Sequence, residues 1–113
     1  MQVEFNADTD QLTASLLGEL DHHGAGEIRE RIDSVILQQH CRHLVLDLSR
    51  LGFMDSSGIG LIMGRYRLML SLGGQLTVTG MTPRMEKMLR MAGLEKLPIW
   101  EKQEKENAHE TNQ

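Results

Sequence analysis

The chain has 113 residues, of which 40% are hydrophobic and 25% charged, close to the composition of a globular domain. This length fits one domain, which can bury a core without metal ions or disulfides. The formal net charge of -4 argues against nucleic acid as the main partner, because duplex binding depends on clustered Lys and Arg.

The first half of the chain predicts two strands, a helix and a third strand. Residues 2–6 and 11–19 alternate between apolar and polar side chains, and the polar residues 7–10 between them predict a hairpin loop. A helix is expected from about Gly24 to Gln39, with an apolar stripe formed by Ala25, Ile28, Ile32, Val35 and Ile36. The third strand is predicted over residues 44–48.

The second half predicts two more helices and a fourth strand. One helix starts after the turn at Ser56 and runs to about Leu72, with Ile59, Ile62, Met63, Tyr66, Met69 and Leu70 at helical spacing. Gly73-Gly74 provides left-handed residues to end it. A strand follows over residues 76–79. Thr82 then caps a third helix, which begins at Pro83 and ends at Gly93. Its apolar face consists of Met85, Met88, Leu89 and Ala92.

This order of elements predicts the α/β class. An N-terminal strand pair precedes strand–helix units, whose right-handed crossovers give a mostly parallel sheet of four or five strands covered by helices. Residues 97–100 can supply a short edge strand. We expect one domain over residues 1–102 and a polar, flexible tail over residues 103–113.

The location of the protein is also constrained. Cys41 is the only cysteine, so no internal disulfide can form, as is usual in a reducing compartment. The N-terminal residues lack the features of a signal peptide, and no apolar run approaches the length of a membrane span. We therefore expect a cytoplasmic protein without direct membrane contact.

The most informative segment is Phe53-Met54-Asp55-Ser56-Ser57-Gly58-Ile59-Gly60, which joins a buried strand to a helix. The two serines lie at a helix N-terminus, where unpaired N–H groups and the positive end of the helix dipole favour an anion. The simpler alternative is that Asp55, Ser56 or Ser57 is an ordinary N-cap.

A second turn, Leu20-Asp21-His22-His23-Gly24, follows the preceding strand and should lie on the same edge of the sheet. Partners of open parallel sheets bind at this edge, so Asp21 can lie near Ser56 and offer a carboxylate to a basic partner residue. Capping of the first helix by Asp21 is an equally good interpretation.

Three other chemistries fit the sequence poorly. A serine hydrolase using His22 or His23 needs Gly-x-Ser-x-Gly, but Met54 and Asp55 stand two residues before Ser56 and Ser57. A phosphoacceptor aspartate, Asp47 or Asp55, lacks the clustered carboxylates that hold Mg²⁺. The spacing of His40, Cys41 and His43 matches no zinc motif and predicts a solvated loop. We therefore expect no catalytic residues, no metal and no cofactor.

Several segments together resemble a known family. They are Gly18-Glu19-Leu20-Asp21-His22-His23, Arg42-His43-Leu44-Val45-Leu46-Asp47-Leu48, the segment from Phe53 to Gly60, Gly64-Arg65-Tyr66 and Gly73-Gly74. In this pattern the chain is similar to the anti-sigma factor antagonists of spore-forming bacteria, and most similar to those of the sporulation anti-sigma-F factor. The resemblance covers about residues 1–102 and keeps one register from Gly18 to Leu97.

The resemblance implies a STAS-type domain that is a regulator and not an enzyme. Its unphosphorylated form would bind an anti-sigma factor, which is also an ATP- or ADP-bound serine kinase, and release the sporulation sigma factor. Phosphorylation of Ser56 would inactivate it, and a serine phosphatase would restore it. An antagonist from a stress-response cascade is the alternative, and a small enzyme using Ser56 or Ser57 is less favoured.

The partner-binding residues expected from the serine turn and the resemblance are Asp21, Asp55, Ser56, Ser57, Gly58, Ile59 and Met88. The resemblance favours partner contact for Asp21. Helical periodicity places Ile59 and Met88 in the core, so either would be an interface anchor only where it is exposed.

Overall fold

The computed structural model describes residues 1–101. Along them the elements are β1 (Gln2–Asn6), β2 (Gln11–Leu20), α1 (Ala25–Gln39), β3 (His43–Met54), α2 (Ser56–Ser71), β4 (Gln75–Thr79) and α3 (Pro83–Met91). The strands form one sheet in the order β1-β2-β3-β4, with β1 antiparallel to β2 and the other pairs parallel. The predicted α/β fold with an N-terminal strand pair and a mostly parallel sheet is confirmed.

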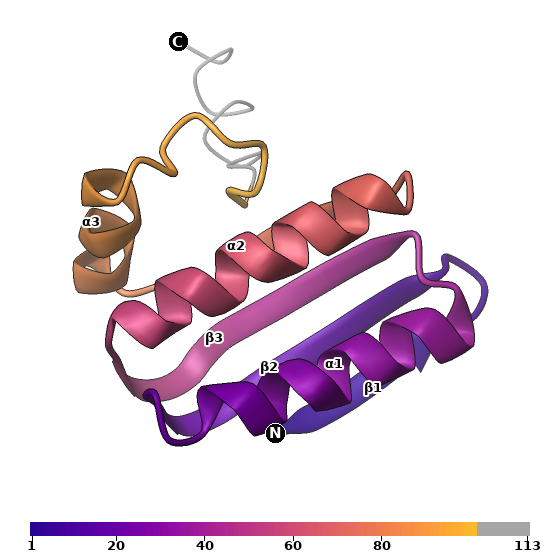
Figure 1. The fold of residues 1–113 in the computed structure, drawn as a ribbon, viewed down its shortest axis with the longest axis horizontal. Coiled ribbons are helices and arrows are strands. Elements are labelled where there is room, and N and C mark those ends of the chain that lie inside the picture. Colours follow the sequence, from indigo (N-terminus) through magenta and orange to yellow (C-terminus); the bar gives the residue numbers. More distant parts are fainter. Residues whose placement is uncertain (102–113) are drawn as a thin grey trace, which may run out of the picture.

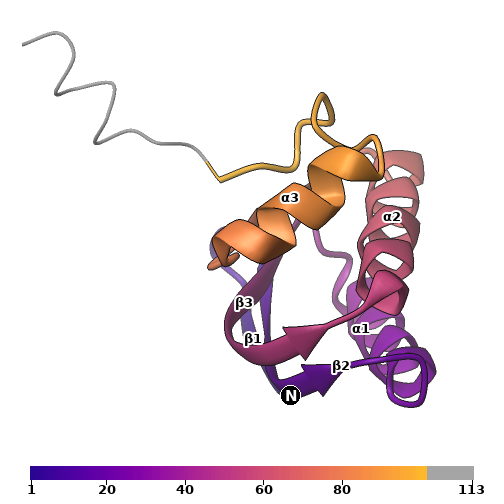
Figure 2. The same cartoon turned by 90° about the vertical axis from the view of Figure 1, so that its left-hand side faces the viewer.

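The two long helices cover one face of the sheet. α1 and α2 run side by side along the strands in Figure 1, and Figure 2 shows both on the same side of the sheet. The strand order advances by one position at each crossover, and right-handed crossovers in one direction place their helices on one face. The expected helical cover is therefore limited to this face. The other face carries mainly polar side chains, among them Glu4, Thr13, Ser15, His43, Asp47 and Thr77.

The core lies mainly between the sheet and the two long helices, is completed by the buried face of α3, and consists mainly of leucine and isoleucine. Its fully buried large side chains are Leu12, Leu16, Leu20, Ile32, Ile36, Leu44, Leu46, Leu48, Ile62, Met69, Leu76 and Leu89. Of the stripe predicted for the first helix, Ile32 and Ile36 are fully buried and the others are partly buried. The buried hydrophobic side chains of residues 1–101 form one cluster.

β3 is much longer than the strand predicted over residues 44–48. Its second half buries Leu48, Leu51 and Met54 at a spacing of three residues, because the pairing of β3 with β2 shifts register twice. Strict alternation, the sign by which a strand is usually predicted, is therefore lost there. The consequence is that β2 and β3 extend together up to the serine turn.

Other boundaries differ in smaller ways. Of the glycine pair after α2, only Gly73 has a positive φ, +75°, whereas a Cβ on Gly74 would lie 2.5 Å from the Arg42 carbonyl oxygen. Residues 97–100 form one bridge, between Val78 and Trp100, in place of a strand. Thr82 caps α3 as predicted, its hydroxyl accepting from the Met85 N–H at 3.2 Å. The tail predicted over residues 103–113 lies outside the described residues.

Candidate functional site

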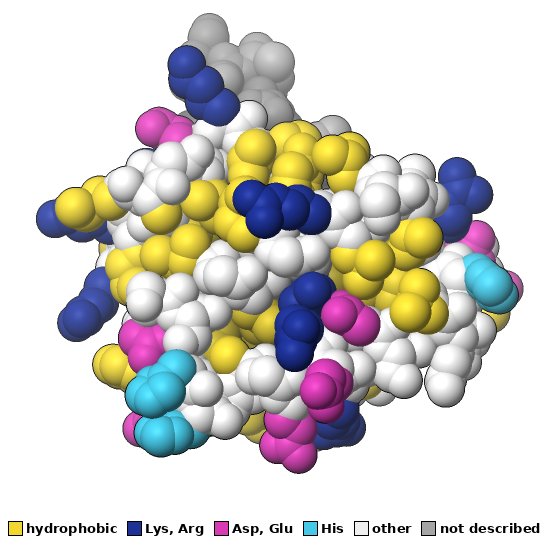
Figure 3. Space-filling view, in the orientation of Figure 1, with side chains coloured by type: hydrophobic (Ala, Val, Ile, Leu, Met, Phe, Trp, Pro, Cys, Tyr) yellow, Lys and Arg dark blue, Asp and Glu magenta, His cyan; other side chains and the backbone are white. Residues whose placement is uncertain are grey.

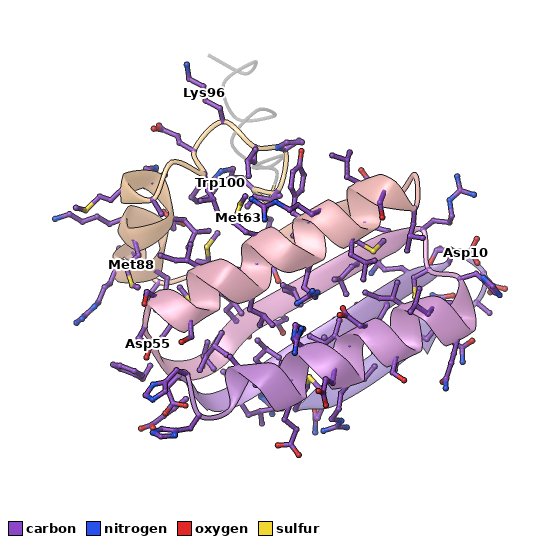
Figure 4. All side chains as sticks on the ribbon, viewed as in Figure 1. Asp10, Asp55, Met63, Met88, Lys96 and Trp100 are labelled. Atoms are coloured by element: carbon purple, nitrogen blue, oxygen red, sulfur yellow. The ribbon has the colours of Figure 1, made fainter. Side chains whose placement is uncertain are left out.

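Two turns meet where β2 and β3 end. Leu20 pairs with Met54 in the parallel register, and the Asp55 N–H donates to the Leu20 carbonyl oxygen at 3.2 Å. Figure 4 labels Asp55 at the end of the molecule where α1 and α2 both begin. We call this end, formed by residues 20–24 and 54–59, the rim. It brings the two predicted site segments together.

Ser56 is the first residue of α2 and is exposed to solvent. The N-cap is Asp55 and neither serine, because the Asp55 carboxylate accepts the Ser57 N–H at 2.8 Å and its carbonyl accepts the Gly58 N–H at 2.9 Å. Ser57 is half-buried, and within residues 1–101 no hydrogen bond engages the Ser56 hydroxyl. Ser56 therefore presents a free hydroxyl at the most accessible point of the turn.

Gly58 was expected at the contact surface, but it is a buried residue of the rim. A Cβ at this position would overlap the Met54 side chain and lie 3.1 Å from Leu20 Cδ2. The first turn of α2 therefore packs directly on the ends of β2 and β3 because residue 58 has no side chain. Gly58 positions the serine turn and cannot itself offer a contact surface.

Asp21 organises the second turn. Its carboxylate accepts the backbone N–H groups of His23 and Gly24 at 3.0 and 3.1 Å. The residue that precedes α1 is Gly24, which makes no side-chain cap. Asp21 is partly exposed at the rim, so the local structural role and a role in partner contact are compatible.

The two predicted apolar contacts, Ile59 and Met88, are both partly buried and pack against the core. Ile59 lies in the first turn of α2, and Figure 4 labels Met88 on α3 at the same end of the molecule as Asp55. Each is accessible over part of its surface. The core packing expected from periodicity is therefore present, and a role of either residue in partner contact stays a prediction.

The sequence did not point to two residues, one at this site and one at the centre of α2. Phe53 is 44% exposed, although it lies between Gly52 and the buried Met54 at the end of β3. Arg65 in α2 is 6% exposed and forms an ion pair with Asp33 of α1, with 2.8 Å between Nε and Oδ1. The exposure of Phe53 could not be predicted because the end of β3 is irregular. The burial of Arg65 could not be predicted because an arginine in a helix usually faces solvent.

The residues of the rejected zinc cluster, and Asp47, lie outside the rim. Cys41 is buried, contrary to the solvated loop that we expected, and His43 bonds to the Thr77 hydroxyl at 2.8 Å. The Asp47 carboxylate accepts from the Ser15 hydroxyl and the Ser49 N–H. Burial would raise the pKa of Asp47, but these hydrogen bonds outweigh it and hold that pKa below its ordinary value.

Residues 1–101 lack two features that would indicate other functions. No three His, Cys, Asp or Glu side chains in this part of the chain are grouped to hold a metal ion. Its helices also include none that is long and apolar enough to cross a membrane.

The chain is similar to known proteins over most of its length. Residues 2–108 match the model of the STAS domain. An anti-sigma F factor antagonist from Paenibacillus polymyxa is 41% identical over 102 residues, which are 89% of this chain and 87% of the relative. An anti-sigma-B factor antagonist from Bacillus subtilis is 24% identical over 94 residues, 83% of this chain and 84% of the relative.

The fold is also similar to that of a solved antagonist in two forms. The anti-sigma factor antagonist SpoIIAA in its unphosphorylated form superposes with a TM-score of 0.72 at 31% identity, covering 98% of this chain and 96% of the other. The Bacillus cell fate determinant SpoIIAA in its phosphorylated form gives 0.70 at 31% identity, covering 96% of both chains.

Proposed function

Because this chain belongs to the STAS domain family and, within it, to the anti-sigma F factor antagonists, we propose that it binds an anti-sigma factor under the control of Ser56. The unphosphorylated protein binds the anti-sigma factor and frees the sporulation sigma factor. Phosphorylation of Ser56 ends this binding, and a serine phosphatase restores it. The protein acts in the cytoplasm and does not bind nucleic acid, a membrane or a cofactor.

The observation that carries this proposal is the accessibility of Ser56. Its hydroxyl is exposed at the start of α2, while Asp55 performs the capping that would otherwise require a serine. The hydroxyl can therefore enter the active site of another protein without disturbing the helix start. Ser57 is half-buried, so its hydroxyl is a poorer substrate.

The modification is a phosphoryl transfer from the nucleotide of the anti-sigma factor. The Ser56 Oγ attacks the γ-phosphorus of ATP, and the new O–P bond replaces the bond to the bridging oxygen of the leaving ADP. The hydroxyl proton passes to a base of the kinase. Ser56 is thus a substrate, and the catalytic groups belong to the partner.

The phosphate would act through charge and bulk at the contact surface. It adds about -1.5 to -2 charges at neutral pH beside the Asp55 and Asp21 carboxylates. Desolvating that charge in an interface, or placing it against an acidic group, is unfavourable enough to change affinity by orders of magnitude. The rim requires no refolding for this effect, because a helix N-terminus tolerates an anion.

We infer that the contact surface consists of Asp21, Asp55, Ser56 and Ser57 with the exposed parts of Ile59 and Met88. Phe53 joins it, because a large apolar side chain that is 44% exposed beside Ser56 is a natural anchor for a protein partner. Gly58 contributes by holding the turn against Met54.

Replacing Asp21 with Asn should weaken binding of the anti-sigma factor while leaving the melting temperature within a few degrees. The Asn side-chain oxygen can still accept the His23 and Gly24 N–H groups, so the turn is kept and only the charge is lost. Calorimetric titration measures the binding. Asp21→Ala is the control for the turn, with an expected loss of about 1 kcal/mol of stability. Parallel loss of stability and binding in Asp21→Asn would assign the residue to the fold.

Incubation with the anti-sigma factor and ATP should place one phosphate on the chain, on Ser56. Peptide mapping by mass spectrometry checks the position, and Ser56→Ala should abolish the modification while Ser57→Ala keeps it. A phosphate on Ser57 would overturn the assignment. An unmodified chain would contradict the proposed function itself.

An antagonist of a stress-response cascade is the second candidate, since the anti-sigma-B factor antagonist of Bacillus subtilis is 24% identical to this chain. The higher identity to an anti-sigma F factor antagonist, 41%, favours the sporulation partner. Binding to the anti-sigma factors of the two cascades, measured side by side, separates the candidates.

A further inference from the structure

Phosphate on Ser56 would meet a helix start whose donors are already engaged. The Ser57 and Gly58 N–H groups both donate to Asp55, at 2.8 and 2.9 Å. At the neighbouring turn, the His23 and Gly24 N–H groups donate to the Asp21 carboxylate. Two aspartates thus occupy four of the backbone donors at the rim, so a side-chain cation would add to the stabilisation that the helix N-terminus gives an anion.

Two histidines at the same end of the molecule can provide it. His22 and His23 are exposed, and their rings lie 4.0 Å apart between centroids with a tilt of 37°. Figure 3 shows histidine side chains, in cyan, gathered at the end of the molecule that holds the β2–α1 turn. The hydrogen bond from the Asp55 N–H to the Leu20 carbonyl oxygen, 3.2 Å long, holds this turn beside the start of α2.

We propose that His22 and His23 form the binding site for the phosphoryl group on Ser56 within the same chain. The ligand class is a phosphate monoester dianion, held by imidazole N–H donors. The inference rests on the proposed modification of Ser56. It gives His22 and His23 a function. Neither the proposed partner contacts nor the geometry of the turn requires histidine at these two positions.

The surrounding charges favour this assignment. α3 carries the exposed cations Arg84 and Lys87. On the other elements the groups at this end are carboxylates: Glu19 on β2, Asp21 in the turn, Glu27 in the first turn of α1 and Asp55 at the cap of α2. A dianion added among them is strongly repelled unless a cation forms nearby. Histidine is the side chain that can gain a charge between about pH 5 and 8, the range in which a phosphate monoester also titrates.

The test is the titration of the phosphate. Phosphoserine is placed at residue 56 during synthesis of the full chain, and its phosphorus resonance is followed against pH in the wild type and in a variant with His22→Asn and His23→Asn. A unit charge about 7 Å away in water shifts a titration midpoint by about 0.4 pH units. We expect the phosphate to lose its second proton at a pH lower by at least that amount in the wild type than in the variant.

His40→Asn is the matched control, because His40 is exposed at the other end of α1 and has a positive φ that Asn tolerates. Its phosphate should titrate as in the wild type. Equal midpoints in the wild type and the double variant would overturn the proposal. Because phosphoserine is installed without the kinase, this result is independent of whether the anti-sigma factor modifies Ser56, which peptide mapping tests separately.

Discussion

Replacing Ser56 with Asp should weaken binding of the anti-sigma factor by about 100-fold or more, which corresponds to about 2.8 kcal/mol. The new carboxylate adds a charge beside Asp55 and Asp21, at a surface that must be desolvated in the complex. Ser56→Ala should bind within about threefold of the wild type, because a surface substitution usually changes a free energy by less than about 0.5 kcal/mol. Calorimetric titration with the ADP-bound anti-sigma factor measures both affinities.

Ser34→Asp is the control for charge alone, since Ser34 is exposed in the middle of α1 and distant in sequence from the rim. It should bind as the wild type does. Ser56→Ala should in addition keep its affinity after incubation with ATP, whereas the wild type loses affinity as it is phosphorylated. Equal affinities of Ser56→Asp and Ser56→Ala would show that charge at the rim does not end the complex.

Replacing Asp33 with Asn should destabilise the fold by about 2–3 kcal/mol, which is large for a residue outside the hydrophobic core. Arg65 would be left buried without its counter-charge, and its Nη1 already lacks a hydrogen-bond partner among residues 1–101. Burial lowers the pKa of Arg65, and the Asp33 charge 2.8 Å away opposes that effect. Urea denaturation measures the change in the free energy of unfolding.

Glu86→Gln is the matched control, because Glu86 and Arg90 form an exposed ion pair at 3.7 Å on α3. Its loss should cost about 0.5 kcal/mol or less. Joint replacement of Asp33 with Leu and Arg65 with Met should recover part of the stability, since it removes both charges from the interface. A cost for Asp33→Asn no larger than that for Glu86→Gln would contradict this account of the pair.

The ion pair matters for function because α1 and α2 both begin at the rim. It links the two helices at their centres, and each helix carries one of the turns that meet beside Ser56. A change in the angle between the helices would alter the position of Asp21 relative to Ser56.

The serine turn could be placed from sequence because local signals agree there. A strand, a capping aspartate and a periodic helix follow one another, and these interactions are short-range. The meeting of this turn with Asp21 followed from the parallel arrangement of β2 and β3. The identity of the cap did not, because Asp55, Ser56 and Ser57 are equally good candidates by residue type.

The features that could not be predicted from the sequence depend on contacts between elements that are distant along the chain. Arg65 is buried only because Asp33 of α1 lies opposite it, and a charged residue within a helix is otherwise expected in water. The second half of β3 follows the irregular pairing with β2, which replaces alternation by a spacing of three. Gly58 is buried by Met54 and Leu20, and neither contact can be read from the Asp-Ser-Ser-Gly pattern.

We propose that the phosphorylation state of Ser56 decides whether this protein displaces a sigma factor. The most direct measurement adds the unphosphorylated chain, or the chain with phosphoserine at residue 56, to a preformed complex of the sporulation sigma factor with its ADP-bound anti-sigma factor. Free sigma factor is then quantified by size-exclusion chromatography. We predict stoichiometric release by the unphosphorylated chain and no release by the phosphorylated one at the same concentration. Equal release by both, or release by neither, would contradict the account.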